Sequence, residues 1–343
     1  WALMRRRWPA PQGKETEAFE KDIESYIGCK NAIAVNNGTS ALMTAMLAHG
    51  IKSGDEVLVP TFTFIASVNA IIAIGAKPVL VDSDPETFNT TPELMERYLT
   101  KKTKAIVPVD VAGMPVDVDA FTEFAKNNNL IMIEDAAEAI GAQYKNNKIG
   151  SFNHTAIFSF HMAKLITSVE GGCVVTSNEE IARKCSMIQN HGMQKKYEHK
   201  LFGLNFRLTD IQSAIGRAQL KKINEYIKWR NKLVKIYKKE LGESVEYQKI
   251  PDYANVHPHM IFGVLTDKRK RDYIIKYLKK GGVDTRICWP PVHTQEYHKK
   301  IFNGKYPGSE QIASRIINLP IGNMLSKEDV NYVIKIFKKA LKN

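Results

Sequence analysis

Lys164 is a candidate catalytic residue because it lies in an apolar stretch, FSFHMAKLITSVEGG, that begins at Phe158. Removal from water disfavours the charged form of a lysine. A neutral amine is a nucleophile that can form a Schiff base with an aldehyde. Ser159, a few residues earlier, could donate its hydroxyl to a phosphate. The ordinary alternative is a lysine whose long side chain reaches solvent, and a single lysine usually does so.

A second candidate is the turn VNNGTSAL at residues 35–42. A strand is expected to end here, and Gly38, Thr39 and Ser40 are expected to begin an apolar, periodic helix. The free backbone N–H groups of a helix N-terminus, with hydroxyls beside them, can bind an anion such as phosphate. The alternative is a plain helix cap, because caps of this kind are common.

A third candidate is Asp135, in the segment IMIEDAAEAIGA at residues 131–142. It stands at the carboxyl end of an apolar strand, the edge where open α/β sheets bind ligands. A carboxylate in this largely apolar setting requires a cationic partner. A protonated ring nitrogen of a cofactor could be that partner. The alternative, a second helix N-cap, is about as well supported by this motif alone.

The three motifs together favour one cofactor. Along the chain, the anion-binding helix N-terminus (the phosphate cup, residues 38–40) comes first, then Asp135 and then Lys164. Each is weak evidence by itself. Pyridoxal 5'-phosphate needs all three: a cup for its phosphate, an acid for its pyridinium nitrogen and a lysine for its aldehyde. The combination therefore predicts a pyridoxal phosphate site.

The elements around these motifs predict an α/β fold with a mostly parallel seven-stranded sheet flanked by helices, because strand-like runs alternate with helical periodicity. The expected strands are 31–36, 56–60, 77–82, 104–111, 130–135, 155–160 and 171–177. The gap between the last two is too short for a crossover helix, so the seventh strand is expected to be antiparallel to the sixth. Lys164 then lies in the loop that joins them.

The C-terminal third predicts a smaller α+β domain. A long helix is expected over 208–241, a strand over 259–265, a helix over 271–282 and a closing helix over 331–343. We expect the boundary near residue 225, which gives a large domain over 1–225 and a small one over 226–343. The sequence shows neither a low-complexity linker nor an internal repeat.

Composition excludes some classes of protein. The 343 residues are 44% hydrophobic and 25% charged, and no apolar run approaches the roughly 20 residues that span a bilayer. The four cysteines (Cys29, Cys173, Cys185 and Cys288) form no C-x-x-C pair and favour a reducing, cytoplasmic location. The nine histidines form no HExxH motif, so a structural metal is not expected. The net charge of +13 comes without a nucleic-acid-binding signature and suits a phosphate-bearing small ligand equally well.

The sequence resembles the sugar aminotransferases of the DegT/DnrJ/EryC1/StrS type, a branch of the fold-type I pyridoxal phosphate enzymes. The resemblance runs from about Gly13 to the C-terminus and is carried by a long, ordered set of motifs. They include GDEVLVPTFTFIASVNAI, EDAAEAIGA, FSFHMAKLITSVEGG, GLNFRLTDIQSAIGRAQL and LPIGNMLSKEDV.

The resemblance implies roles for the candidate residues. Lys164 would bind the cofactor aldehyde covalently and move a proton between substrate and cofactor. Asp135 would keep the pyridine nitrogen protonated, and Phe64 would stack on the ring. Phosphate contacts would come from Gly38, Thr39, Ser40, Ser159 and, across a homodimer with shared active sites, Asn205. Phe62 and Asn205 have ordinary alternatives, strand packing for the first and a loop turn for the second.

The sequence departs from the family pattern at three places. Glu138 stands where the family usually has Gln or His near the cofactor's 3' oxygen, and a carboxylate would repel a phenolate there. The segment TSVEGG replaces the commoner TTGEGG, which should change the flexibility of the loop and not the role of Lys164. The N-terminal segment that helps line the substrate site in the family is mostly absent, so activity is less firmly implied than fold.

The implied activity is transfer of an amino group from L-glutamate to a nucleotide-linked keto-sugar, without nucleic acid or membrane as partner. Two alternatives stay open: an aminotransferase acting on a keto-cyclitol, and a non-catalytic regulator that retains the fold. The sugar would contact variable loops at 191–203 and 286–298, where His161, Trp289 and His293 are candidate contacts or packing residues.

Overall fold

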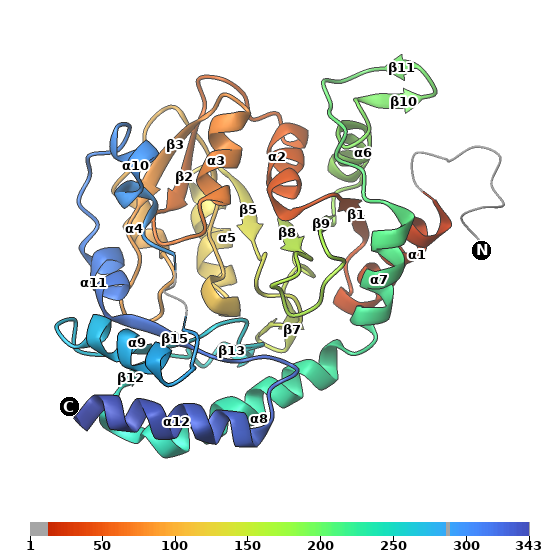
Figure 1. Ribbon diagram of the computed structural model, residues 1–343. Coiled ribbons are helices and arrows are strands. Elements are labelled where there is room, and N and C mark those ends of the chain that lie inside the picture. Colours follow the sequence, from red (N-terminus) through yellow and green to blue (C-terminus); the bar gives the residue numbers. More distant parts are fainter. Residues whose placement is uncertain (1–12, 286–288, 343) are drawn as a thin grey trace.

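The computed structural model describes residues 13–285 and 289–342, and Cys288 lies outside these ranges (Figure 1). Its centre is a seven-stranded sheet in the order β1-β9-β8-β5-β4-β2-β3. The strands are β1 (Asn31–Val35), β2 (Glu56–Pro60), β3 (Lys77–Val81), β4 (Thr103–Ile106), β5 (Ile131–Asp135), β8 (Thr155–Ser159) and β9 (Gly172–Thr176). These seven strands confirm the seven that the sequence predicts.

The sheet is mostly parallel, as expected. β3, β2, β4, β5 and β8 pair in parallel, and β9 is antiparallel to both β8 and β1. The antiparallel seventh strand is therefore confirmed, and its cause is the short connection from β8, which is too short for a crossover. Every residue of β2, β8 and β9 is buried, as expected for strands covered on both faces.

Helices cover both faces of this sheet, so the architecture has three layers. One hydrophobic cluster packs α1 (Lys14–Ile27) and α5 (Val118–Asn127) against one face, and another packs α2 (Gly38–Ala48), α3 (Ala66–Ala73) and α6 (Glu179–Ile188) against the other. Side chains alternate along the strands between the two clusters: Leu58 joins the first, and Val57 and Val59 join the second.

The predicted single helix over 208–241 is wrong, because the structure has two helices, α7 (Asp210–Leu220) and α8 (Ile223–Leu241). No Pro or Gly marks the break. Leu220 and Ile223 both enter the core of the sheet layer, whereas Leu233 and later residues of α8 enter a separate C-terminal cluster. The chain must turn between these two cores, and a tight turn in which Lys222 N–H donates to Gln219 O makes the change of direction.

The C-terminal part forms a separate, smaller group of elements beside these three layers, called the C-terminal layer below. A three-stranded antiparallel sheet in the order β12-β14-β15 packs with α8, α9 and α12, which lie together along one end of the central sheet (Figure 1). The elements are β12 (Glu246–Tyr247), β14 (Phe262–Leu265), β15 (Ile316–Leu319), α9 (Arg271–Lys280) and α12 (Lys327–Lys342). The strand expected over 259–265 begins only at Phe262. The division into domains near residue 225 stays a prediction.

Smaller elements connect the layers. β13 (Ala254–Val256) pairs with β6 (Gln143–Tyr144), which pairs with β7 (Asn147–Lys148), so a C-terminal strand adds to a hairpin from the first half of the chain. A second hairpin, β10 (Met193–Lys195) and β11 (Glu198–His199), projects from the body (Figure 1). None of the helices in the described part of the chain combines the length and apolar composition that a membrane crossing requires.

Candidate active site

A cavity of about 1060 Å³ lies between the loops that follow the strands of the central sheet and the C-terminal layer. It brings together ten of the residues predicted from the sequence. They are Gly38, Thr39, Ser40, Phe64, Asp135, Glu138, Ser159, His161, Lys164 and Trp289. These residues come from the loops after β1, β2, β5 and β8 and from the C-terminal part, so the edge of the sheet where ligands are expected does hold the site.

The N-terminus of α2 forms one wall of this cavity. The side chain of Asn37 caps the helix by accepting a hydrogen bond from Ser40 N–H at 2.8 Å. The N–H groups of Gly38 and Thr39 have no acceptor among the described residues, because they precede the helical hydrogen-bond ladder. A side chain at position 38 would come within 3.0 Å of Ser159 Cβ, so glycine lets the helix end approach the β8 loop. Two free donors in a close turn are suited to phosphate.

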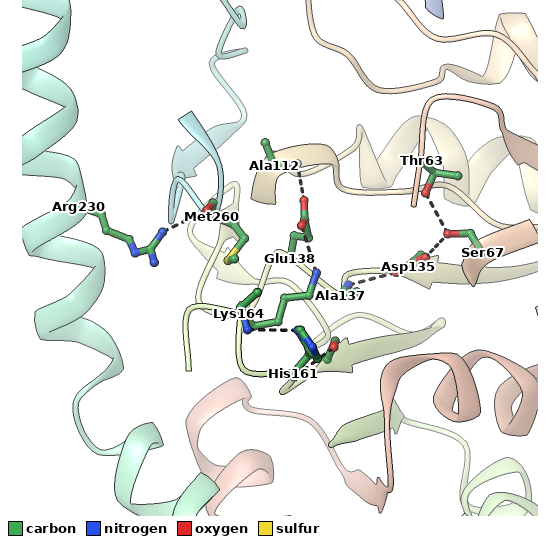
Figure 2. Close-up of polar contacts among 12 residues, drawn as sticks. Thr63, Ser67, Ala112, Asp135, Ala137, Glu138, His161, Lys164, Arg230 and Met260 are labelled. Carbon is green, nitrogen blue, oxygen red and sulfur yellow. Dashed lines mark hydrogen bonds and ion pairs between the residues drawn. The ribbon is translucent and has the colours of Figure 1, made fainter. Parts of the chain in front are cut away.

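Asp135 is buried at the end of β5. Its Oδ2 accepts a 2.7 Å hydrogen bond from Ser67 Oγ, which in turn accepts from Thr63 Oγ1, and its Oδ1 accepts from Ala137 N–H (Figure 2). Burial raises the pKa of this carboxyl group, and the hydrogen bond from Ser67 opposes that rise. None of these bonds comes from a cation, so a protonated ring nitrogen would compensate a buried carboxylate here.

Lys164 lies in the loop between β8 and β9, as predicted, and its amine meets a carboxylate. Nζ donates to Glu138 Oε1 at 3.1 Å, and both side chains are mostly buried. The other oxygen, Oε2, accepts a 3.0 Å bond from Ala112 N–H (Figure 2). Ala112 has φ +62°, a conformation that costs a non-glycine residue energy, so a strained turn aims its N–H at Glu138.

The apolar neighbours of Lys164 do not surround its amine, which corrects one expectation. Leu165 and Ile166 are fully buried in the core of the sheet layer, and Met162 is 67% exposed. Leu165 and Ile166 therefore anchor the loop in the core, and the amine itself forms an ion pair with Glu138. The interpretation of Glu138 as a residue near the cofactor oxygen stays a prediction, and its contact with Lys164 is an addition that the sequence did not indicate.

Aromatic residues flank the opening. Phe64 is 53% exposed in the cavity wall, and its ring centroid lies 6.2 Å from that of Trp289. An exposed ring at this place is available to stack on a planar cofactor. His161 is half-exposed, and its Nε2 lies 3.5 Å from Glu170 Oε1, which lines the same cavity.

Two predicted residues lie outside the cavity wall. Asn205 is exposed and forms a bridge with Asn190, so it contributes nothing to the cavity of its own chain. His293 is buried, with Nδ1 at 2.8 Å from Thr61 Oγ1, and its packing is the second of the two alternatives that the sequence left open. Phe62 is likewise fully buried, in an edge contact with Phe88.

The sequence did not indicate several polar residues of the cavity wall, among them Ser67, Glu170 and Arg230, nor Asn323, which accepts a hydrogen bond from Arg230. Arg230 carried a usable signal. It follows Ile223 and Ile227 on the buried face of an amphipathic helix, where a charged residue needs a reason. Ser67 and Asn323 had no local signal, because their partners are distant in the chain.

The family comparison agrees with this geometry. The profile of the DegT/DnrJ/EryC1/StrS aminotransferase family matches residues 2–338. The chain belongs to this family. It is therefore a pyridoxal phosphate-dependent sugar aminotransferase of fold type I, and solved structures of similar proteins hold the cofactor or its amino form. The cup, the buried aspartate and the lysine fit the three parts of that cofactor.

Named relatives are similar over nearly the whole chain. The GDP-perosamine synthase of Caulobacter vibrioides is 37% identical, over 98% of this chain and 93% of the relative. The GDP-perosamine synthase of Escherichia coli O157:H7 is 38% identical, over 95% and 90%. The crystal structure of S. venezuelae DesV in complex with a ketimine intermediate has a TM-score of 0.95 and 33% identity, over 99% of this chain and 92% of that one.

Proposed function

We propose that this aminotransferase moves an amino group from L-glutamate to a keto-sugar carried on a nucleoside diphosphate. The observation that carries the proposal is the convergence of Lys164, Asp135 and the free N–H groups of α2 on one cavity of about 1060 Å³. A cavity of this size accommodates a substrate beside the cofactor. The assignment of a nucleotide-linked sugar is supported by the names of two similar proteins, both GDP-perosamine synthases.

The residues have separate tasks in this proposal. When bound, pyridoxal phosphate supplies an aldehyde for covalent attachment and a ring that accepts electrons from the substrate carbon. Gly38, Thr39 and Ser159 would hold its phosphate, and Asp135 would hold the proton on the ring nitrogen. Lys164 would move a proton at the reacting carbon. Glu138 orients the lysine through its 3.1 Å contact.

A spectrum and a substrate panel test the proposal. We expect the protein with pyridoxal phosphate to show a visible absorbance band that Lys164→Ala removes and that Lys52→Ala, at an exposed lysine, leaves intact. Glutamate should bleach this band, and a nucleoside diphosphate keto-sugar should restore it. Product mass across GDP-, UDP- and dTDP-linked keto-sugars identifies the acceptor. Failure to bind the cofactor, or amination of free keto-cyclitols alone, would refute the proposal.

The proposed assembly is a homodimer with shared active sites. Asn205 is exposed outside its own cavity, and beside it Tyr197 and Phe202 are 80% and 70% exposed on the segment that carries the β10–β11 hairpin. Large exposed aromatic side chains of this kind are typical of an interface.

Subunit mixing tests the shared sites. Lys164→Ala and Asn205→Ala each impair every site of their own homodimer, but a mixed dimer has one site with both native residues. Recovery of activity on mixing supports the arrangement, and its absence in a confirmed mixed dimer contradicts it. The cytoplasmic location stays a prediction.

A further inference from the structure

A buried arginine from the C-terminal layer lines the cavity opposite the strand loops. Arg230, on α8, is only 5% exposed. Its Nη1 donates to the carbonyls of His259 and Met260 at 3.0 and 3.1 Å, and its Nε donates to Asn323 Oδ1 at 3.0 Å. All of these acceptors are neutral. Figure 2 shows the guanidinium pointing from α8 toward Met260, on the side of Lys164.

This cation lacks an anionic partner. Burial lowers the pKa of Arg230 to about 10, so the group is still charged at neutral pH. Its Nη2 has no hydrogen-bond acceptor among the described residues. A buried charge without a counter-ion is costly, and an anion entering the cavity would relieve that cost.

The other charges of the cavity direct an anion to this place. Lys164, the second cation in the described wall, is already paired with Glu138. The remaining charged residues of the wall are acidic, apart from the titratable His161: Asp135, Glu170 and Asp284. Arg230 is therefore the one cation of the described wall without a carboxylate partner, and the carboxylates of that wall repel a substrate anion.

Arg230 is also tied to the loop of Lys164. Asn323, which accepts from Arg230 Nε, donates through Nδ2 to the carbonyl of Leu165 at 3.2 Å. Two hydrogen bonds thus connect the guanidinium to the residue that follows the reactive lysine. A group bound by Arg230 is therefore held beside the loop that carries the amine, as a substrate whose proton Lys164 moves requires.

We propose that Arg230 binds a carboxylate of the amino donor through Nη2. The inference rests on the proposed aminotransferase function and adds to it the chain's own recognition group for the donor. A single mostly buried guanidinium with one free nitrogen suits one carboxylate group. A nucleoside diphosphate, with at least two charges, would need further cations that the described wall lacks.

The test uses glutarate, which has the two carboxylates of glutamate and no amine to react. Its dissociation constant is measured by titration calorimetry on the protein loaded with pyridoxal phosphate. Arg230→Met should weaken glutarate about 10- to 150-fold, the range for a hydrogen bond to a charged group. Lys232→Met removes an exposed cation from the same helix and should leave the constant unchanged.

A second measurement holds even where Arg230→Met does not fold. On the unchanged protein, glutaramide, the neutral diamide of glutarate, should fail to compete with glutarate, and Arg230→Lys should weaken glutarate less than Met does. In the half-reactions, Arg230→Lys should raise the half-saturating concentration of glutamate and leave that of the keto-sugar unaltered, which a purely structural role would not do.

Two outcomes overturn the inference. One is a folded, cofactor-loaded Arg230→Met protein that binds glutarate within about threefold of the unchanged protein, a change below that of a charged hydrogen bond. The other is loss of GDP binding in place of glutarate binding, which assigns Arg230 to the diphosphate. Both differ from failure of the proposed function, in which the visible band or the turnover with glutamate is absent from the unchanged protein.

Discussion

Val169 has a backbone conformation that its side chain disfavours, and this predicts an unusual mutational result. Its φ is +72°, in the left-handed region, where a β-branched residue is rare. It follows Lys164 in the β8–β9 loop, at the position of the first glycine in the commoner segment TTGEGG. We predict that Val169→Gly gives a more stable protein than Val169→Ala.

The magnitude follows from two opposing effects. A Cβ atom in the left-handed region costs about 1–2 kcal/mol, which glycine avoids and alanine does not. Glycine in turn loses about 0.4–1 kcal/mol relative to alanine through the entropy of the unfolded chain. The glycine variant at position 169 should therefore be more stable than the alanine variant by about 0.8 kcal/mol, the difference between the mid-range values of those two effects.

Ile301 is a matched control, because it is 51% exposed against 47% for Val169 and is not among the residues with positive φ. At position 301 the alanine variant should be more stable than the glycine variant by about 0.4–1 kcal/mol. The sign of the stability difference between glycine and alanine therefore reverses between the two sites. With an unfolding entropy of about 2.1 cal/mol/K per residue, the total contrast of about 1–2 kcal/mol equals roughly 1.5–3 °C in melting temperature.

Scanning calorimetry of the four variants at one pH and one protein concentration measures this contrast. Each variant should still attach pyridoxal phosphate through Lys164, which shows that the loop retains its place. The reasoning is wrong if alanine equals or exceeds glycine at position 169 while the Ile301 pair behaves as expected.

Three further predictions concern buried charge. Burial and the charge of Glu134 raise the pKa of Asp110 well above 3.8. Folding therefore takes up a proton, and stability falls as pH rises above about 4. Measured by melting temperature, Asp110→Asn should stabilise the protein more at pH 8 than at pH 5. Burial lowers the pKa of His257, and it lowers that of His259 to about 3. Stability should therefore fall as pH drops below 6.5, by up to about 1.4 kcal/mol per pH unit for each histidine. His257→Gln should flatten this dependence of stability on pH. Glu138→Gln replaces the carboxylate that accepts the hydrogen bond from Lys164 Nζ, so the lysine loses its orienting partner. Cofactor attachment to the apoprotein should then slow by about 10-fold, the effect of a lost hydrogen bond to a charged group; an unchanged rate would refute the orienting role.

Much of the cofactor site was predictable because its residues lie at strand ends. Asp135 and Ser159 end apolar strands, and Gly38 follows one after a two-residue turn; parallel strands bring such ends to one edge. The antiparallel turn of β9 was predictable for a similar reason, since the length of a connection limits the direction of the next strand. In these cases local sequence and global arrangement are linked by a simple geometric rule.

Residues whose partners are distant in the chain were not predictable. Ser67 bonds to Asp135 across 68 residues, and Asn323 bonds to Leu165 across 158. The order of the strands in the sheet and the break between α7 and α8 have the same origin, because both depend on which core each segment enters. Helical periodicity continues through the break at Lys222, so tertiary packing overrides the local preference.

Arg230 belongs between these two groups, and it shows how such residues can be found. A charged residue that takes an apolar position of a helix must be compensated, and its compensation need not come from the protein. Here the partners are three neutral oxygens, which satisfy hydrogen bonds and leave the charge unbalanced. The sequence shows the position, the structure shows the missing anion, and the cavity beside it supplies a place for one. The strand ends thus bind what the whole family shares, the cofactor, and the C-terminal layer contributes the group that we assign to the donor.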